Sequence, residues 1–142
     1  MSDSPPKSYR LDGLRLSIIL IVRNRGTPEI AYFGPSLPSG ISLAHVALLR
    51  SRGAFQSALE CDIVQATLMP SLGTGLFSPP AIRGHRSGLD WTADFAVVDV
   101  QQSESSLTLT MRDDVTELTL LSVLEMAPGG VLTADSDGSR HP

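Results

Sequence analysis

The sequence predicts an all-β domain folded as a β-sandwich. Apolar residues recur at every second position in several short segments, and Gly, Pro, Asn or Asp residues separate these segments. Successive side chains of a strand point to opposite faces of a sheet, so this period of two is typical of strands with one buried face. Many short strands joined by polar turns indicate two packed sheets.

The first predicted strand covers residues 14–22, in which the alternating apolar residues are Leu14, Leu16, Ile18, Leu20 and Val22. Its second half is apolar on both faces, which predicts a central position in a sheet. Asn24-Arg25-Gly26 follows, and Asn and Gly tolerate a positive φ. Residues 28–33 should therefore form the second arm of a hairpin, ending at Gly34-Pro35.

Three further strands are predicted over residues 91–97, 107–111 and 118–126, with turns at Asp113-Asp114 and at residues 128–130. Residues 42–52 have the one helical spacing of apolar residues, which favours either a short surface helix or a loop. The first eight residues and residues 133–142 are polar, and we expect both to be disordered tails. A single domain at residues 9–132 remains.

Charge and composition exclude several classes of function. The sequence contains eleven Lys and Arg residues and fifteen Asp and Glu residues, which gives a net charge of −4. Attraction to nucleic acid or anionic lipid should therefore be weak. The longest apolar run, residues 18–22, is too short to span a bilayer, and the first residues do not resemble a signal peptide. We expect a cytoplasmic protein with neither a nucleic-acid nor a membrane partner.

No set of residues in this sequence matches a catalytic or metal-binding pattern. The three His residues are His45, His85 and His141, no G-x-S-x-G turn occurs, and the single Cys61 has no basic neighbour to activate it. The Asp residues follow no ligand spacing. We expect no catalytic residue, no metal and no cofactor.

One long loop, residues 70–88, is the candidate for a functional segment, because long loops in compact domains often carry function. Its basic residues Arg83, His85 and Arg86 fit either an acidic ligand or a solvated edge. Trp91 follows the loop and fits either stacking on a sugar ring or packing in the core beside Phe95.

Four stretches, taken in order, resemble the N-terminal domain of α-galactosidases (melibiases) of glycoside hydrolase family 36 over residues 9–132. They are Tyr9-Arg10-Leu11-Asp12-Gly13-Leu14, residues 28–34, the loop from Gly73 to Arg86, and Asp90-Trp91 with Phe95. The resemblance implies a galactose-mutarotase-like supersandwich that precedes a (β/α)8 barrel. It also implies that two barrel Asp residues perform the retaining hydrolysis, so this chain alone should be inactive.

The resemblance further implies which residues reach a substrate pocket for terminal α-galactosides. They are Tyr32, Phe33, Gly73, Gly75, Phe77, His85 and Arg86. We add Trp91 as a candidate substrate-binding residue, because its ring could stack on a sugar. The same residues could instead only dock the barrel. Leu76 stands where many relatives have an acidic residue, which removes an acceptor for a sugar hydroxyl.

The C-terminal end departs from the family pattern, because residues 135–139 are polar where relatives continue with another strand. We therefore expect a sandwich that is incomplete at its C-terminus, with an unpaired edge that promotes self-association. The partners implied are the barrel and an α-galactoside. Two alternatives stay open: a stand-alone carbohydrate-binding module that stacks sugars on Trp91, Tyr32 and Phe77, and an interaction domain without a ligand.

Overall fold

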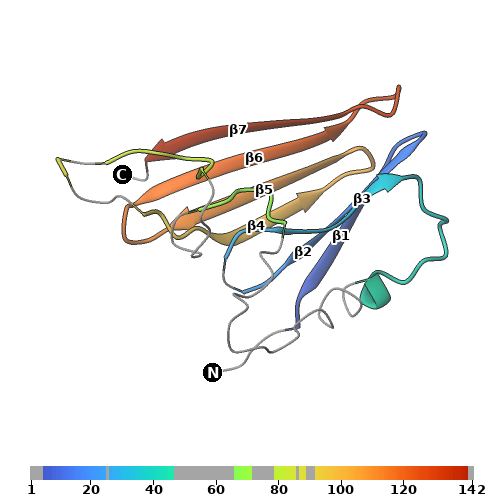
Figure 1. Cartoon of the computed structure of the whole chain (residues 1–142), viewed down its shortest axis with the longest axis horizontal. Helices are drawn as coiled ribbons and strands as arrows, with labels where there is room; N and C mark the ends of the chain where they lie inside the picture. Colours follow the sequence, from blue (N-terminus) through green and yellow to red (C-terminus); the bar gives the residue numbers. More distant parts are fainter. Residues whose placement is uncertain are drawn as a thin grey trace.

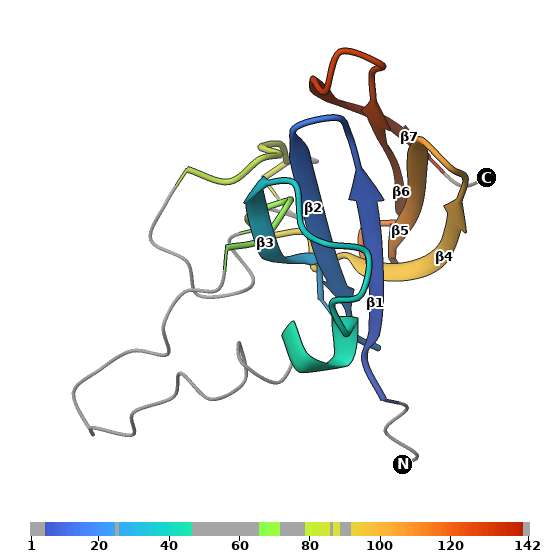
Figure 2. The same ribbon diagram turned by 90° about the vertical axis from the view of Figure 1, so that its right-hand side faces the viewer.

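The structure is a computed structural model that describes residues 5–24, 26–46, 66–71, 79–85, 87, 88 and 92–140. In these residues the chain forms a three-stranded sheet in the order β1-β2-β3 and a four-stranded sheet in the order β4-β5-β6-β7. Every pairing within the two sheets is antiparallel. Figure 1 shows the two sheets, and Figure 2 shows them as separate layers. The predicted all-β sandwich is confirmed.

The three-stranded sheet consists of β1 (Lys7–Asp12), β2 (Leu16–Val22) and β3 (Glu29–Pro35). β2 lies in the centre and is buried on both faces from Ser17 to Val22, as its apolar second half predicted. Gly26 has a φ of 84°, which fits the predicted turn between β2 and β3. β1 was not predicted as a strand, and its first two residues lie in the expected N-terminal tail.

The four-stranded sheet consists of β4 (Ala96–Gln102), β5 (Ser106–Asp113), β6 (Leu118–Met126) and β7 (Leu132–Arg140). β5 and β6 lie where the apolar alternation predicted them. β4 begins at Ala96 and extends to Gln102, so the strand predicted over residues 91–97 is displaced toward the C-terminus. Its second half is mostly exposed, which explains why no apolar alternation marked it.

The tail expected over residues 133–142 is wrong for residues 133–140, which form β7. The register with β6 is continuous from Met126↔Leu132 to Leu118↔Arg140. Residues 133–139 are all exposed, so this strand needs no apolar alternation and is held by backbone pairing with β6. This is why the polar sequence did not reveal a strand.

The core lies between the sheets and has two parts. The larger one contains Leu11, Ile18, Leu20, Val22, Leu107, Leu109, Leu124 and Met126. The smaller one contains Phe95, Met111 and Leu120, and the half-buried Met69 and Ala93 pack against it. The smaller part thus lies beneath both ends of the long loop. No helix within the described ranges is long and apolar enough to cross a membrane.

The one described helical segment covers residues 43–46, inside the range 42–52 where the sequence allowed a short helix or a loop. Residues 47–52 lie outside the described residues.

Candidate functional site

The long loop that the sequence marked as a functional candidate enters the fold along the edge of β3. The backbone N–H of Ile30 donates to Ala66 O at 2.6 Å, and that of Leu68 donates to Pro28 O at 2.9 Å. Between these two bonds, Thr67 forms an isolated bridge with Glu29, and its hydroxyl donates to Pro28 O at 3.1 Å. Residues 66–68 therefore extend the three-stranded sheet and fix the start of the loop.

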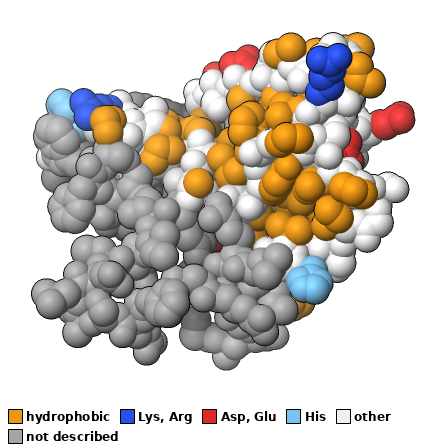
Figure 3. Space-filling model, turned by 45° about the vertical axis from the view of Figure 1, so that its right-hand side comes forward, with side chains coloured by type: hydrophobic (Ala, Val, Ile, Leu, Met, Phe, Trp, Pro, Cys, Tyr) orange, Lys and Arg blue, Asp and Glu red, His pale blue; other side chains and the backbone are white. Residues whose placement is uncertain are grey.

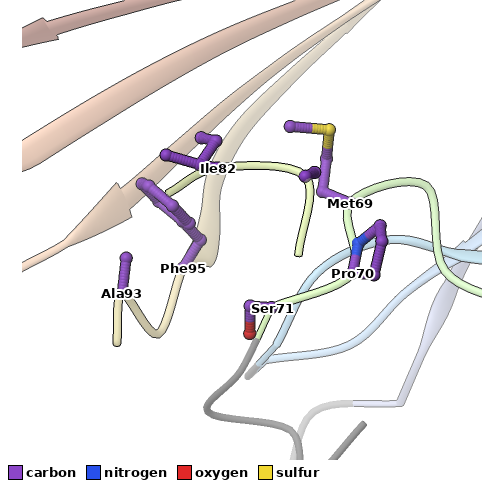
Figure 4. Close-up of a pocket in the computed structure, with 7 residues that line it drawn as sticks. Met69, Pro70, Ser71, Ile82, Ala93 and Phe95 are labelled. Carbon is purple, nitrogen blue, oxygen red and sulfur yellow. The ribbon is translucent and has the colours of Figure 1, made fainter. Parts of the chain in front are cut away.

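A small apolar pocket lies where the described loop residues cross the start of β4. It is lined by Met69, Pro70, Ser71, Ala81, Ile82, Ala93 and Phe95. Figure 4 shows the Ile82, Met69 and Phe95 side chains around it. The N–H of Ala81 donates to Pro70 O at 2.8 Å and joins the two described loop segments. A sugar site needs several polar side chains to bond its hydroxyl groups, whereas Ser71 is the one polar side chain among the seven that line this pocket. The pocket therefore does not fit a sugar.

Asp113 holds the end of the loop segment against the β5–β6 turn. It is 3% exposed, and its Oδ2 accepts from the N–H of Asp94 at 3.2 Å and from the hydroxyl of Thr116 at 2.7 Å. Oδ1 accepts from the N–H of Val115 at 3.0 Å. Burial raises the pKa of Asp113, but these hydrogen bonds outweigh burial and leave the pKa below its ordinary value. One carboxylate thus fixes both a turn and the approach to β4.

A second polar cluster fixes the segment after β3 to the outer face of the three-stranded sheet. The guanidinium of Arg10 donates to Pro38 O at 3.0 Å and also to Leu37 O, while its Nε lies 2.8 Å from the Asp12 carboxylate. The fully buried Ser17 hydroxyl donates to Asp12 and accepts from the N–H of Leu37 at 3.0 Å. These contacts hold residues 37 and 38 over the sheet.

Tyr32 and Phe33, the two predicted site residues of β3, point to opposite faces. Tyr32 pairs with Ile19, is half-buried, and donates its hydroxyl to Pro35 O at 2.7 Å. Phe33 pairs with Ile18 on the core face, yet it is 60% exposed. The structure therefore does not join these two rings in one stacking surface, and Phe33 alone offers an open ring.

His85 is the third predicted site residue that the structure describes. It is exposed, and its Nδ1 accepts from the N–H of Gly88 at 3.2 Å within the loop. Figure 1 shows residues 79–85 toward one end of the long axis and the C-terminal end of β3, which carries Phe33, toward the other. The other predicted site residues lie outside the described residues; they are Gly73, Gly75, Phe77, Arg86 and Trp91.

Three large exposed apolar side chains lie at one side of the molecule, while Ile82, Val98, Val115 and Leu121 are exposed on other elements. Figure 3 shows an extended hydrophobic surface on the side where Figure 1 places the end of β3 and the β1–β2 and β6–β7 turns. These elements carry three large exposed residues: Phe33, Leu14 at 77% and Val131 at 60%. Gly130 meets Leu14, because a Cβ at Gly130 would lie 3.8 Å from the Cβ of Leu14. Surfaces of this kind commonly mark interaction sites.

Sequence reasoning missed the two polar clusters around Asp113 and Ser17. Asp113 was recognised only as a turn residue, and Ser17 was not singled out, whereas both are buried. An Asp followed three positions later by a Thr, as in Asp113 and Thr116, is a local turn signal that could have been found in the sequence. Across the described ranges, no group of three or more His, Cys, Asp or Glu residues is placed to hold a metal.

The chain is similar to known proteins over most of its length. Residues 26–137 match the glycosyl hydrolase family 36 N-terminal domain. An α-galactosidase from Escherichia coli is 38% identical over 113 residues, which are 80% of this chain and 16% of that protein. A solved α-galactosidase from Lactobacillus brevis superposes with a TM-score of 0.72 at 16% identity, over 97% of this chain and 22% of the solved chain. This chain thus spans less than a quarter of either relative.

Proposed function

The chain belongs to the glycosyl hydrolase family 36 N-terminal domain family, and from this premise we propose that it is the non-catalytic part of an α-galactosidase, which supports hydrolysis of terminal α-galactosides. In the proposal it docks on a (β/α)8 barrel and helps to shape the pocket of that barrel. The observation that carries the proposal is the 38% identity with a protein of which this chain matches only 16%. A cytoplasmic location is part of the same proposal.

The exposed apolar side supports docking on a larger partner. Leu14, Phe33 and Val131 are between 60% and 77% exposed, although side chains of this size favour burial. Leu14 and Val131 lie in turns, where no strand pairing requires an apolar residue. We propose that the barrel covers these three residues.

The fixed ends of the long loop support a role in shaping a pocket. Residues 66–68 are bonded to β3, and Asp94 is bonded to Asp113, so both ends are held by the sandwich. A loop with fixed ends can present a side chain to a neighbouring site at low entropic cost. The exposed ring of Phe33 is a second candidate for contact with a sugar, at the other end of the molecule.

Two assays test the proposal. Titration calorimetry of the purified chain with galactose, melibiose and raffinose should give no saturable heat, and a chromogenic α-galactoside should not be hydrolysed. A chimera of the E. coli α-galactosidase, in which this chain replaces the segment that aligns with it, should hydrolyse the chromogenic substrate. Saturable binding by the free chain would instead favour a carbohydrate-binding module, and turnover by the free chain would contradict the proposal.

A further inference from the structure

The outer edge of β7 is an unpaired strand edge within the part of the chain that the structure describes. β7 is the last strand in the sheet order, and residues 133–139 are all exposed. Figure 1 shows it along the border of the four-stranded sheet. A long strand edge with free backbone groups is a template for pairing with another strand.

The direction of the β7 backbone groups follows from its register with β6. The N–H of Ala127 donates to Val131 O at 2.9 Å, and the register then runs without a shift from Met126↔Leu132 onward. Hydrogen-bonded and non-hydrogen-bonded pairs alternate along an antiparallel ladder. Odd-numbered residues of β7 therefore bond to β6, and even-numbered residues direct their N–H and C=O groups outward. Ser136 agrees with this, because its N–H donates to the Asp135 carboxylate at 2.9 Å.

This alternation restricts how two copies could pair edge to edge. Antiparallel bonding between two β7 edges must couple even-numbered residues with even-numbered ones, so odd-numbered residues also face each other. A register centred on Ser136 places Asp135 opposite Asp137 of the second copy. Two neighbouring registers are also allowed. One places Asp135 opposite Asp135 of the second copy, and the other places Asp137 opposite Asp137 of the second copy. In each of these three longest registers, therefore, two negatively charged Asp side chains lie directly opposite each other, which is destabilising.

We propose that the β7 edge is a surface for antiparallel pairing with a second copy of this chain, and that Asp135 and Asp137 keep the two copies apart. The backbone groups of Ala134 and Gly138 and the C=O of Ser136 supply the bonds, because the Ser136 N–H already donates to Asp135. The side chains at these three positions are small enough for close approach. Removing the two carboxylate charges converts the edge into a dimer interface. This use of charged residues at an edge is a known protection against association.

The test is light scattering with size exclusion across a concentration series. We expect the variant Asp135→Asn/Asp137→Asn to dimerise with an association constant about tenfold above that of the unaltered chain, since two directly opposed like-charge pairs are removed. The control Asp99→Asn/Asp114→Asn removes the same charge from exposed sites off this edge and should behave as the unaltered chain. Equal dimerisation of the unaltered chain and the edge variant would overturn the proposal.

Two further variants locate the contact. Gly138→Pro removes an outward N–H that β6 does not use, and nothing lies within 4 Å of a Cβ at this position, so it should abolish dimers of the edge variant. A chain with Asp135→Lys/Asp137→Lys should form a heterodimer with the unaltered chain, because opposite charges then face each other. Dimers that survive Gly138→Pro, or no heterodimer in the mixture, would overturn the proposal.

Discussion

The buried carboxylate of Asp113 accepts hydrogen bonds from three different residues. It closes the β5–β6 turn through Val115 and Thr116 and ties Asp94 to the start of β4. Replacing Asp113 by Ala leaves these donors without their acceptor, which should lower the free energy of unfolding by about 1–3 kcal/mol. Urea denaturation measures this loss. Asp114→Ala, which removes an exposed ion pair with Arg112, should cost well under 1 kcal/mol, and equal losses would contradict the role of Asp113.

Because the pKa of Asp113 is lowered in the folded chain, we expect the stability of the fold to depend on pH. Its folded pKa lies below its ordinary value, so the charged form stabilises the fold at every pH above the unfolded pKa of roughly 3.9. That contribution is lost as the pH falls below this value toward the folded pKa. Thermal denaturation of the unaltered chain between pH 5 and pH 2 should therefore show a steeper loss than that of Asp113→Asn. Parallel curves would show that another group carries the acid sensitivity.

Ser17 joins Asp12, the last residue of β1, to residues 37 and 38 on the outer face of the sheet. Ser17→Ala removes the acceptor of the Leu37 N–H and the donor to Asp12. The expected loss of unfolding free energy is about 1–3 kcal/mol, against less than 0.5 kcal/mol for the exposed Ser105→Ala. Hydrogen exchange at the Leu37 amide should accelerate in Ser17→Ala only. An unchanged exchange rate there would contradict the described contact.

At the scale of elements, the β1–β2 turn and β6 meet at Gly13. A Cβ at this position would lie 2.6 Å from the Sδ of Met126 and 3.2 Å from the Cα of Gly130. Met126 is buried in the core and has little room to move, so Gly13→Ala should cost about 1–3 kcal/mol of unfolding free energy. Gly129→Ala meets nothing within 4 Å and is the matched control. Equal stability of the two variants would contradict this close approach.

The sequence reveals those strands that bury a face in the core, because burial requires apolar side chains at alternate positions. β2, β5 and β6 carry apolar alternation because one or both faces are buried, and all three are predicted correctly. β7 is held by backbone pairing with β6, by Leu132 packed on the core and by a hydrogen bond between Ser136 and Ser122. Its residues 133–139 are exposed, as is most of the second half of β4, so these two sequences carry no such signal. The pairing of residues 66–68 with β3 spans about forty residues of chain, and no local pattern encodes a contact at that distance.

The candidate site is less predictable than the fold. The resemblance placed Tyr32 and Phe33 together in a pocket, but consecutive strand residues point to opposite faces. Ring orientation and hydroxyl partners depend on tertiary packing, so sequence spacing alone could not show that Tyr32 bonds to Pro35. The open ring of Phe33 became evident only from its exposure at the edge of the sandwich.

At the scale of the whole molecule, the exposed apolar side predicts how the domain joins a larger enzyme. In the chimera with the E. coli α-galactosidase, Leu14→Lys with Val131→Lys should lower activity and thermal stability, because both charges would be buried against the barrel. The free chain should tolerate the same changes within about 0.5 kcal/mol, since both residues are exposed there. Equal activity of the altered and unaltered chimeras would place the docking surface elsewhere.

We propose that this chain is a supporting domain, and that hydrolysis requires the rest of an α-galactosidase. The most direct measurement is hydrolysis of a chromogenic α-galactoside by the free chain and by the chimera, each first shown to be folded by circular dichroism. We expect turnover by the chimera and none by the free chain. A folded chimera without activity, or turnover by the free chain, would contradict this proposal.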